Sequence, residues 1–248
     1  MRLPLTVIIP TLNEASNIAA CVASADLADE VIVADGGSAD DTVAVARAAG
    51  ATVLERTGPT IAAQRNAAIA VARHRWIFAL DADERITPAL AAELESVLAA
   101  PAHAAYRVRY RNFYLGVEQT RGSWARKSGV RLFGSDRRYL ERQVHESLEP
   151  VADTGELVGT ILHHPYRSLA HHLEKLHRYA EWGAADLWAR GKRATWSDLA
   201  LRPAWRFFKE YVLGGGVLEG RRGFVLAVLD AYAGFLKYAH LWAREQRR

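Results

Sequence analysis

Two aspartates, Asp81 and Asp83, stand one residue apart at the end of the apolar run formed by residues 76–80. The run predicts a short buried strand, and open α/β sheets bind ligands at the carboxyl ends of their strands. Magnesium is usually held by one or two carboxylates together with substrate phosphates. The pair therefore predicts a divalent cation held against a diphosphate, although a lone D-x-D is weak evidence because acidic pairs also end ordinary strands.

Three further polar segments occupy comparable places earlier in the chain. They are Pro10-Thr11-Leu12-Asn13-Glu14 after residues 5–9, Asp35-Gly36-Gly37-Ser38 after residues 31–34, and Gln64-Arg65-Asn66 in the helix after residues 52–54. Because carboxyl ends of parallel strands share one edge of a sheet, we expect all of them to converge on one crevice with Asp81 and Asp83. Asp40, Asp41 and Thr42 are interpreted as helix capping.

Regular alternation of strand and helix over the first 110 residues predicts a mostly parallel sheet with helices on both faces. Strand-like runs cover residues 5–9, 31–34, 52–54, 76–80 and 106–110, and helical patterns cover 18–25, 42–49, 61–72 and 89–99. Thr87 and Pro88 predict the start of the last helix. Further strand-like runs cover 130–133 and 157–162, and the chain is mostly helical from residue 168. The predicted domains are therefore 1–165 and a helical region, 166–248.

The C-terminal part is basic and rich in tryptophan. Residues 202–248 carry nine Lys/Arg against four Asp/Glu, within a formal net charge of +4, and five of the seven tryptophans follow residue 180. This predicts an anionic membrane surface as partner. Packing on the core with a solvated basic face, or a dimer contact, remains an open alternative. No uncharged apolar stretch reaches the ~20 residues of a spanning helix, since Asp230 and Lys237 interrupt residues 224–239, so we expect a soluble or peripheral protein.

The single cysteine excludes an internal disulfide and is typical of a reducing compartment. The first residues lead directly into a strand-like run, followed too soon by Asn13 and Glu14 for a signal peptide.

The motifs V-I-I-P-T-L-N-E, V-I-V-A-D-G-G-S-A-D-D-T, A-A-Q-R-N-A-A-I and L-D-A-D-E together resemble the family-2 inverting nucleotide-sugar glycosyltransferases with the A-type fold. The resemblance implies that Asp35 accepts a hydrogen bond from the nucleotide base and that Arg65 lies along the nucleotide or its phosphates. It implies that Asp83 binds Mg²⁺ or Mn²⁺ while Asp81 lies closer to the ribose. The other residues expected around the nucleotide sugar are Pro10, Thr11, Asn13, Glu14, Gly36 and Ala82.

An inverting transfer needs a general base for the acceptor hydroxyl and a metal to neutralise the departing diphosphate. The family usually places the base in an acidic dipeptide, whereas this chain has Q-V-H-E-S at 143–147. Glu146 is the predicted base and His145 the alternative, unless both only orient the acceptor or a loop. His163 is predicted to complete the metal shell, with a structural role as the other reading.

The second half of the chain resembles the bacterial lipopolysaccharide inner-core β-1,4-glucosyltransferases. The resemblance rests on R-L-F at 131–133, the His-Glu dipeptide, His163, Lys175, Tyr179 and the tail R-P-A-W-R-F-F-K-E-Y-V-L-G-G-G-V-L-E-G-R-R-G-F followed by A-Y-A-G-F-L-K-Y-A. It implies a UDP-sugar donor, with UDP-glucose expected, and a heptose-containing, lipid-linked or core oligosaccharide acceptor. The enzyme would be cytoplasmic and peripheral at the inner face of the plasma membrane, with no nucleic-acid partner. Residues 1–165 would then bind the nucleotide sugar and catalyse, and 166–248 would meet the acceptor or the membrane.

Rival functions fit less well. Phosphatases of the haloacid dehalogenase type carry Thr or Val at the position of Arg85, and their D-x-D follows an N-terminal strand. In this chain the D-x-D follows the fourth strand-like run. A processive synthase would show a Q-x-x-R-W motif and spanning helices. A non-catalytic sugar-nucleotide-binding module is disfavoured because the acidic and basic site residues are all retained. Another polysaccharide or glycolipid acceptor stays open.

Overall fold

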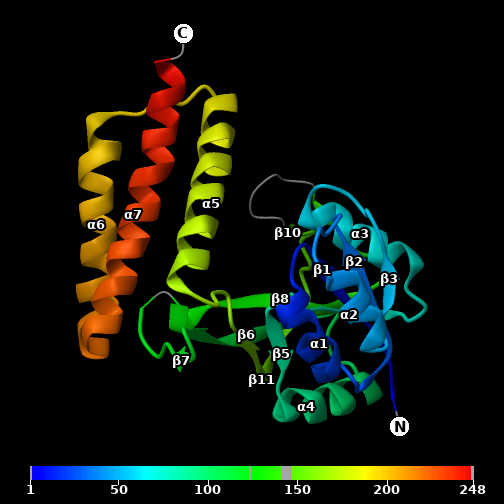
Figure 1. Ribbon diagram of the computed structural model, residues 1–248. Coiled ribbons are helices and arrows are strands. Elements are labelled where there is room, and N and C mark those ends of the chain that lie inside the picture. Colours follow the sequence, from blue (N-terminus) through cyan, green and yellow to red (C-terminus); the bar gives the residue numbers. More distant parts are fainter. Residues whose placement is uncertain (1, 123, 141–146, 247–248) are drawn as a thin grey trace. The chain divides into compact units, whose positions relative to one another are not determined.

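The computed structural model describes residues 2–122, 124–140 and 147–246. The chain forms two compact units, shown in Figure 1. Met1–Phe113 and Lys127–Pro165 make the first, here called the sheet unit, and Tyr114–Arg126 and Tyr166–Arg248 make the second, the helical unit. The helical unit thus includes a segment, Tyr114–Arg126, that lies inside the predicted first domain. The division of roles between the two domains stays a prediction.

The sheet unit is built on strands in the order β3-β2-β1-β4-β8-β6-β11-β5. Their bounds are β1 (Leu3–Thr11), β2 (Ala28–Asp35), β3 (Thr52–Leu54), β4 (Trp76–Ala79), β5 (Glu84–Ile86), β6 (Ala105–Tyr114), β8 (Ser128–Gly134) and β11 (Thr154–His163). Strands β1 to β4 are parallel to one another, β8 is antiparallel to β4 and β6, and β11 runs parallel to β6 and antiparallel to β5. A separate antiparallel pair joins β9 (Tyr139–Leu140) to β10 (Ser147–Leu148).

Helices cover both faces of this sheet. They are α1 (Ala15–Ser24), α2 (Thr42–Ala48), α3 (Ile61–Val71) and α4 (Pro88–Ala99). Buried side chains of α1, α2 and α4 pack in one cluster with Val7 and Ile9, while those of α3 pack in another with Ile8 and Ile32. Successive residues of a strand point to opposite faces, which is why neighbours on β1 divide between the two cores. The predicted α/β fold, with a mostly parallel sheet and a helical C-terminal extension, is confirmed.

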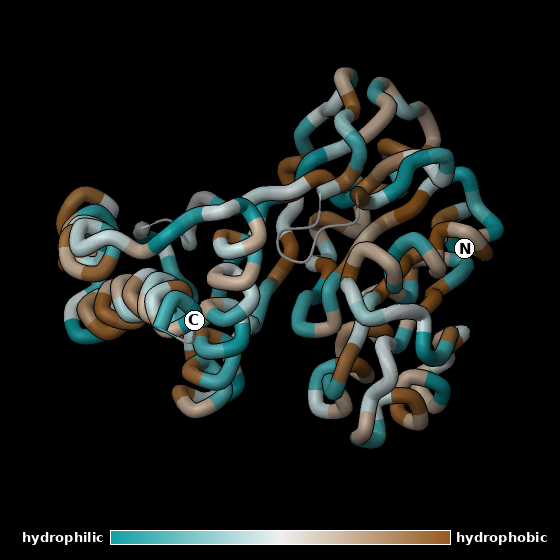
Figure 2. The backbone as a smooth tube through the Cα atoms, turned by 90° about the horizontal axis from the view of Figure 1, so that it is seen from above, coloured by the Kyte–Doolittle hydropathy of each residue, from teal (hydrophilic) through white to brown (hydrophobic). Residues whose placement is uncertain are grey.

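The helical unit contains three long helical segments. They are α5 (Leu169–Ala189), α6 (Arg202–Phe208) with the π-helical turns Ser197–Leu201 and Lys209–Leu213 on either side, and α7 (Gly220–Glu245) after the 3₁₀ turn Gly216–Glu219. The unit also holds β7 (Val117–Glu118) and the 3₁₀ turn Trp124–Arg126. Helix α7 packs against both α5 and α6 (Figure 1). Figure 2 shows apolar and polar positions mixed along each helix, as expected for amphipathic helices.

One helix of the described chain, Gly216–Glu245, is long and apolar enough to cross a membrane, with a mean hydropathy of 1.3 in its best window. This standard allows two charged residues, and Asp230 and Lys237 still interrupt the apolar stretch, as the sequence indicates. The core helix of a helical bundle meets the same standard, and α7 packs on two neighbours. It also carries Asp230, whose carboxylate accepts a hydrogen bond of 2.9 Å from Arg206 Nε.

Candidate active site

The loops that follow β1 and β2 are tied to each other by side chains from the predicted motifs. Asp35 Oδ2 accepts from the backbone N–H groups of Gly37 and Ser38, at 2.8 and 2.9 Å. Asn13 has a left-handed backbone, with φ of 58°, and its Oδ1 accepts from Ala39 N at 2.8 Å. Asp35 and Asn13, both predicted to contact the nucleotide, therefore also fix the conformation of the loops after β1 and β2. These loops are pre-organised before a nucleotide binds.

Gly36 packs closely against the side chain of Gln64. Its N–H donates to Thr11 O at 2.9 Å, and a Cβ built on it would lie 2.3 Å from Gln64 Nε2 of α3. Thr11 Oγ1 is buried and has no hydrogen-bond partner within the described ranges. A buried hydroxyl without a partner is uncommon, so this one is a ready donor or acceptor for a bound group.

The neighbouring predicted residues serve the backbone around these loops. Pro10 is in register with Ala34 of β2, at the end of the parallel pair. Glu14 precedes α1 and its Oε2 accepts from Asn17 Nδ2 at 2.7 Å. The capping interpretation holds in part: Asp40 accepts from the N–H groups of Ala15 and Thr42, but Asp41 makes no side-chain cap.

Asp81 lies between two guanidinium groups. Its Oδ1 accepts from Arg65 Nη2 at 2.5 Å and its Oδ2 from Arg131 Nη2 at 3.1 Å. Arg65 is buried, and its guanidinium lies 4.6 Å from the centroid of the Tyr139 ring. Burial acts to raise the pKa of Asp81, but Arg131 and Arg65 outweigh it and hold that pKa well below the usual range. Asp81 is therefore a fixed anion.

Glu84 completes this arrangement, which we call the Asp81 clamp: Arg65, Asp81, Glu84 and Arg131. The fully buried Glu84 accepts from Arg131 Nη2 at 2.6 Å through Oε1 and from Asp81 N at 2.8 Å through Oε2. Burial raises the pKa of Glu84 to about 8 even though Arg131 lowers it, and the nearby carboxylates of Asp81 and Asp83 add to the rise. Neither Glu84 nor Arg131 was predicted as a site residue, although both stand inside the motifs L-D-A-D-E and R-L-F.

A β-bulge aims Arg131 at the clamp. Tyr106 of β6 lies opposite Leu132 and the next residue, Arg107, lies opposite Val130, so Arg131 is the extra residue on β8. Bulges re-aim a side chain in this way. Arg131 Nε donates to Tyr110 Oη at 2.9 Å.

The second aspartate of the pair faces a histidine. Asp83 Oδ1 and His163 Nε2 are 3.6 Å apart, and His163 Nδ1 lies 2.7 Å from Asn112 Oδ1. An amide oxygen can only accept, so Nδ1 carries the proton and Nε2 presents its lone pair toward Asp83. Burial lowers the pKa of His163, against the opposite effect of Asp83, which keeps the imidazole neutral near pH 7. The adjacent His164 instead stacks on Phe113, with 4.7 Å between the ring centroids.

Asp83 and His163 fit two positions in the shell of a divalent cation. Ligand bonds of about 2.1 Å place two donor atoms between roughly 3.0 and 4.2 Å apart, depending on their angle, and the observed 3.6 Å falls in that range. In the described part of the chain no third His, Cys, Asp or Glu joins them. The remaining ligands would come from diphosphate oxygens and water, as is usual for Mg²⁺. Ala82, between the two aspartates, is buried and its carbonyl accepts from Arg85 Nη1 at 3.0 Å.

Strand spacing brings the two predicted halves of the site within reach of one ligand. Asp35 lies opposite Thr11 of β1, and β4, which Asp81 follows, is the other neighbour of β1. Two strand spacings separate β2 from β4, roughly 10 Å. Glu146 and His145 lie outside the described residues.

A cavity of about 510 Å³ opens beside the clamp. Its walls come from α3, β6, β8 and the β9–β10 pair with the chain that follows. The lining residues are Arg65, Asp81, Arg107, Tyr110, Gly129, Val130, Arg131, Tyr139, Ser147, Leu148, Glu149, Pro150, Val151 and Thr154. The volume is typical of small-molecule sites.

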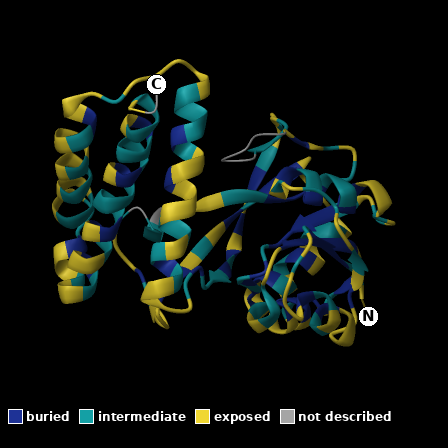
Figure 3. Cartoon of the chain, turned by 45° about the horizontal axis from the view of Figure 1, so that its top comes forward, coloured by how far each residue is buried: buried dark blue, intermediate teal, exposed yellow. Residues whose placement is uncertain are grey.

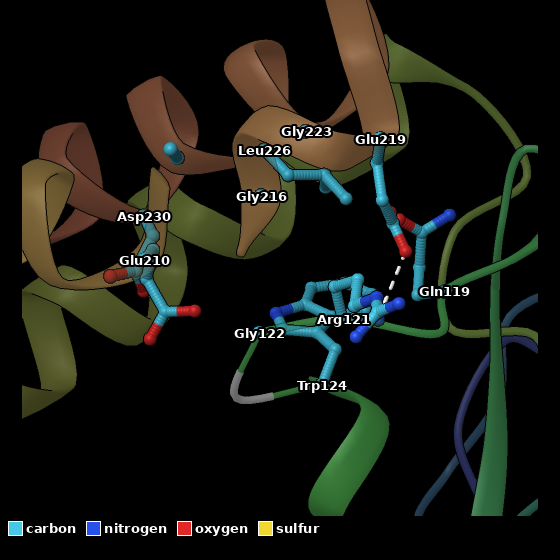
Figure 4. A pocket seen from close by; sticks show the side chains of 11 residues that line it. Gln119, Arg121, Gly122, Trp124, Glu210, Gly216, Glu219, Gly223, Leu226 and Asp230 are labelled. Carbon is cyan, nitrogen blue, oxygen red and sulfur yellow. Dashed lines mark hydrogen bonds between the residues drawn. The ribbon is translucent and has the colours of Figure 1, made fainter. Parts of the chain in front are cut away.

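The helical unit holds a second, much smaller cavity of about 30 Å³, drawn in Figure 4. Glu219 lies at its wall and accepts from the backbone N–H groups of Thr120 and Arg121, at 2.8 and 2.9 Å. The space suits a water molecule and not a sugar. We therefore interpret this cavity as part of the packing that ties Tyr114–Arg126 to α7.

The sequence was also compared with known families and proteins. The sequence model described as "Glycosyl transferase family 2" matches residues 6–151. The lipopolysaccharide core biosynthesis glycosyltransferase LpsC of Rhizobium meliloti is 29% identical over 252 aligned residues, which cover 98% of this chain and 93% of the relative. The glycosyltransferase RP128 of Rickettsia prowazekii is also 29% identical, over 93% of this chain and 84% of its own.

Among solved structures, the glucosyl-3-phosphoglycerate synthase of Mycobacterium tuberculosis, in complex with Mn²⁺, UDP and glucosyl-3-phosphoglycerate, is 26% identical with a TM-score of 0.38. The likeness covers 44% of each chain. An overlap of this size supports no argument about the site.

Proposed function

The chain belongs to glycosyl transferase family 2, and we propose that it transfers a hexose from a nucleotide sugar, with glucose from UDP-glucose expected, to a lipopolysaccharide core or related lipid-linked glycan. The relative from Rhizobium meliloti, matched over 98% of this chain, is named for lipopolysaccharide core biosynthesis, which supports this acceptor class. The donor rests on the resemblance of the four motifs.

The observation that carries the proposal is the pairing of Asp83 with His163 beside the Asp81 clamp. Asp83 Oδ1 and His163 Nε2 lie 3.6 Å apart, and the contact of His163 Nδ1 with Asn112 Oδ1 favours the tautomer that leaves Nε2 as a metal ligand. Mg²⁺ or Mn²⁺ held there would neutralise charge on the departing diphosphate. The clamp fixes Asp81 through Arg65 and Arg131, so this carboxylate keeps one orientation toward the ribose.

The chain's own residues then divide the chemistry. Asp35, Thr11 and Asn13 position the nucleotide on the β1 and β2 side, and the proposed base Glu146 takes the proton of the acceptor hydroxyl. The hydroxyl oxygen forms the new bond to the anomeric carbon as the bond from that carbon to the diphosphate oxygen breaks. Attack from the side opposite the diphosphate inverts the configuration. The assignment of Glu146 rests on its place in Q-V-H-E-S.

A lipid-linked acceptor requires the enzyme to contact a membrane surface. Helix α6 and its flanking turns carry exposed residues that suit this contact. Leu201, Trp205, Phe208 and Val212, called here the apolar stripe, are all exposed and recur at the spacing of one helix face. Figure 3 shows the large exposed areas of these helices. The exposed cations Arg202 and Lys209 flank the stripe, which suits anionic headgroups. Phe207 and Tyr211 of the same helical segment instead pack on Phe224 within the unit.

Donor hydrolysis and calorimetry test the proposal. UDP-sugars with glucose, galactose or N-acetylglucosamine are incubated with Mn²⁺ or Mg²⁺, and UDP binding is titrated with and without metal. We expect metal-dependent hydrolysis that Asp83→Asn removes while the melting temperature without ligand stays unchanged. Asp41→Asn makes the same change on an exposed carboxylate without a cap contact and should behave as wild type.

Two outcomes would contradict this function. Equal UDP affinity in wild type and Asp83→Asn would remove the metal site. Metal-dependent UDP binding without hydrolysis or transfer would favour a non-catalytic binding module.

A further inference from the structure

The cavity beside the Asp81 clamp carries an excess of positive charge. Three arginines and two carboxylates line it: Arg65, Arg107, Arg131, Asp81 and Glu149. Two of the arginines are already engaged, because both donate to Asp81. The Glu149 carboxylate is engaged as well, since its Oε2 accepts from Arg138 N at 3.3 Å.

Arg107 differs from the other two arginines. It is half-buried on β6 and lines the cavity, yet no residue in the described part of the chain gives its guanidinium a hydrogen bond or an ion pair. A guanidinium presents five N–H donors in a planar fork that matches phosphate and carboxylate. The cavity therefore offers a cation of the right shape for an anionic ligand.

The position of Arg107 separates it from the nucleotide side of the site. Phe78 of β4 and Tyr106 of β6 are both in register with Leu132 of β8, so β6 lies two strand spacings from β4. Arg107 is therefore roughly 10 Å from β4, on the side away from β1 and β2. The loops with Thr11 and Asp35 lie on the opposite side of β4.

We propose that Arg107 binds an anionic substituent, phosphate or carboxylate, on the acceptor glycan in the cavity beside Asp81. This inference rests on the proposed function, since it names the chemistry by which that site selects its acceptor. The acceptor's hydroxyl would lie toward Asp81 and its anionic group toward β6. The cavity volume of about 510 Å³ suits a sugar with such a substituent.

Transfer kinetics test the proposal with three acceptor preparations. They are a heptose-containing core oligosaccharide with its phosphates, the same material after phosphatase treatment, and the same material after reduction of its carboxyl groups. We expect Arg107→Gln to raise KM for the intact acceptor about 10- to 100-fold, the size of one charge-assisted hydrogen-bonded contact, with kcat and donor KM within twofold of wild type. Arg107→Lys should recover part of the loss, because it keeps the charge without the fork.

The modified acceptors identify the group. On the preparation that lacks the recognised anion, wild type and Arg107→Gln should have the same KM. Arg109→Gln is the matched control, since Arg109 is exposed, lies two residues along the same strand and does not line the cavity. Unchanged acceptor KM in Arg107→Gln would overturn the proposal. So would a raised donor KM with unchanged acceptor KM, which would assign Arg107 to the donor diphosphate.

A direct binding measurement keeps this proposal separate from the proposed function. With the protein saturated with UDP and Mn²⁺, glucose 6-phosphate, glucuronate and glucose are titrated by NMR. At least one of the two anionic sugars should bind about tenfold more tightly than glucose, and Arg107→Gln but not Arg109→Gln should remove the difference. Equal binding of all three sugars would overturn the anion site whatever the enzyme transfers. The anion preference without any transferase activity would support the site and contradict the proposed function.

Discussion

Replacing Arg131 by methionine removes the centre of the Asp81 clamp. Three hydrogen bonds are lost, to Glu84 at 2.6 Å, to Tyr110 at 2.9 Å and to Asp81 at 3.1 Å. The side chains of Arg131 and Glu84 are only 8% and 2% exposed, so water cannot replace the lost partner. Asp81 is the anion that pairs with Arg131 at pH 7, and removing one partner from a buried charged cluster typically costs about 3–5 kcal/mol. We expect the free energy of unfolding, measured in urea at pH 7, to fall by this amount.

The loss should grow with pH. Glu84 in the folded protein has a pKa of about 8, raised by burial, and Arg131 lowers it. Without Arg131 the carboxyl must keep its proton to a higher pH, at ~1.4 kcal/mol per unit of pKa change. The penalty should therefore be larger at pH 9 than at pH 6. In wild type itself, stability should fall as pH rises from about 4.3 to 8, because the unfolded chain releases this proton first.

Two further variants sharpen this test. Glu84→Gln in the Arg131→Met background removes the carboxyl that has lost its partner, so the double variant should recover about 1–2 kcal/mol at pH 9. Arg109→Met removes an exposed arginine and should change stability by less than about 0.5 kcal/mol. A penalty below about 1 kcal/mol for Arg131→Met, or one that is the same at pH 6 and pH 9, would refute the reasoning.

Three other predictions concern activity, metal and membrane. Glu146→Gln keeps the shape of the side chain but removes the proton acceptor, so turnover should fall about 10²–10⁴-fold with UDP affinity unchanged. Near-normal turnover would contradict Glu146 as the base and favour His145. Because burial lowers the pKa of His163, Mn²⁺ affinity in the UDP complex should persist below pH 6.5 and then fall as the imidazole protonates. His163→Ala should flatten this pH profile. A loss of Mn²⁺ affinity centred above pH 6.5 would contradict the assignment of His163 as a metal ligand. Wild type should co-sediment with anionic vesicles, less so at high salt, and Trp205→Glu should weaken this binding. Val158→Glu, which makes the same kind of change at an exposed apolar residue of the sheet unit, should not weaken it. Vesicle binding that Trp205→Glu leaves intact would exclude the apolar stripe.

Most elements of the sheet unit could be predicted because their signals are local. The alternation of strand-like and helical segments depends on residues close in sequence. So does the cap of α4, in which Thr87 Oγ1 accepts from Leu90 N at 3.2 Å. The clamp could not be predicted in this way. Arg131 and Glu84 are 47 residues apart, and only the extra residue on β8 turns the guanidinium toward the D-x-D loop. Register shifts of this kind depend on how three strands fit together, and no periodicity in one strand reveals them.

The same limit applies to Arg107 and to the segment Tyr114–Arg126. A run of three arginines at alternate positions of one strand predicts a polar face, but not that the first lines a cavity while the second is exposed. The segment Tyr114–Arg126 belongs to the helical unit through contacts with residues about a hundred positions away, such as Thr120 N with Glu219 Oε1. Long-range packing decided both outcomes.

The structure explains why two aspartates one residue apart have different tasks. Each oxygen of Asp81 accepts from an arginine, so the charge of this carboxylate is already compensated. Asp83 has a neutral histidine across 3.6 Å, and that histidine is oriented by Asn112. Orientation of a histidine ligand by an outer hydrogen bond strengthens metal binding. It follows that Asp81→Asn should alter the position of the donor and the stability of the clamp, whereas Asp83→Asn should act chiefly through the metal. Metal titrations at fixed UDP therefore separate the two carboxylates: only Asp83→Asn should shift the Mn²⁺ dependence, and an equal shift in both variants would refute this division.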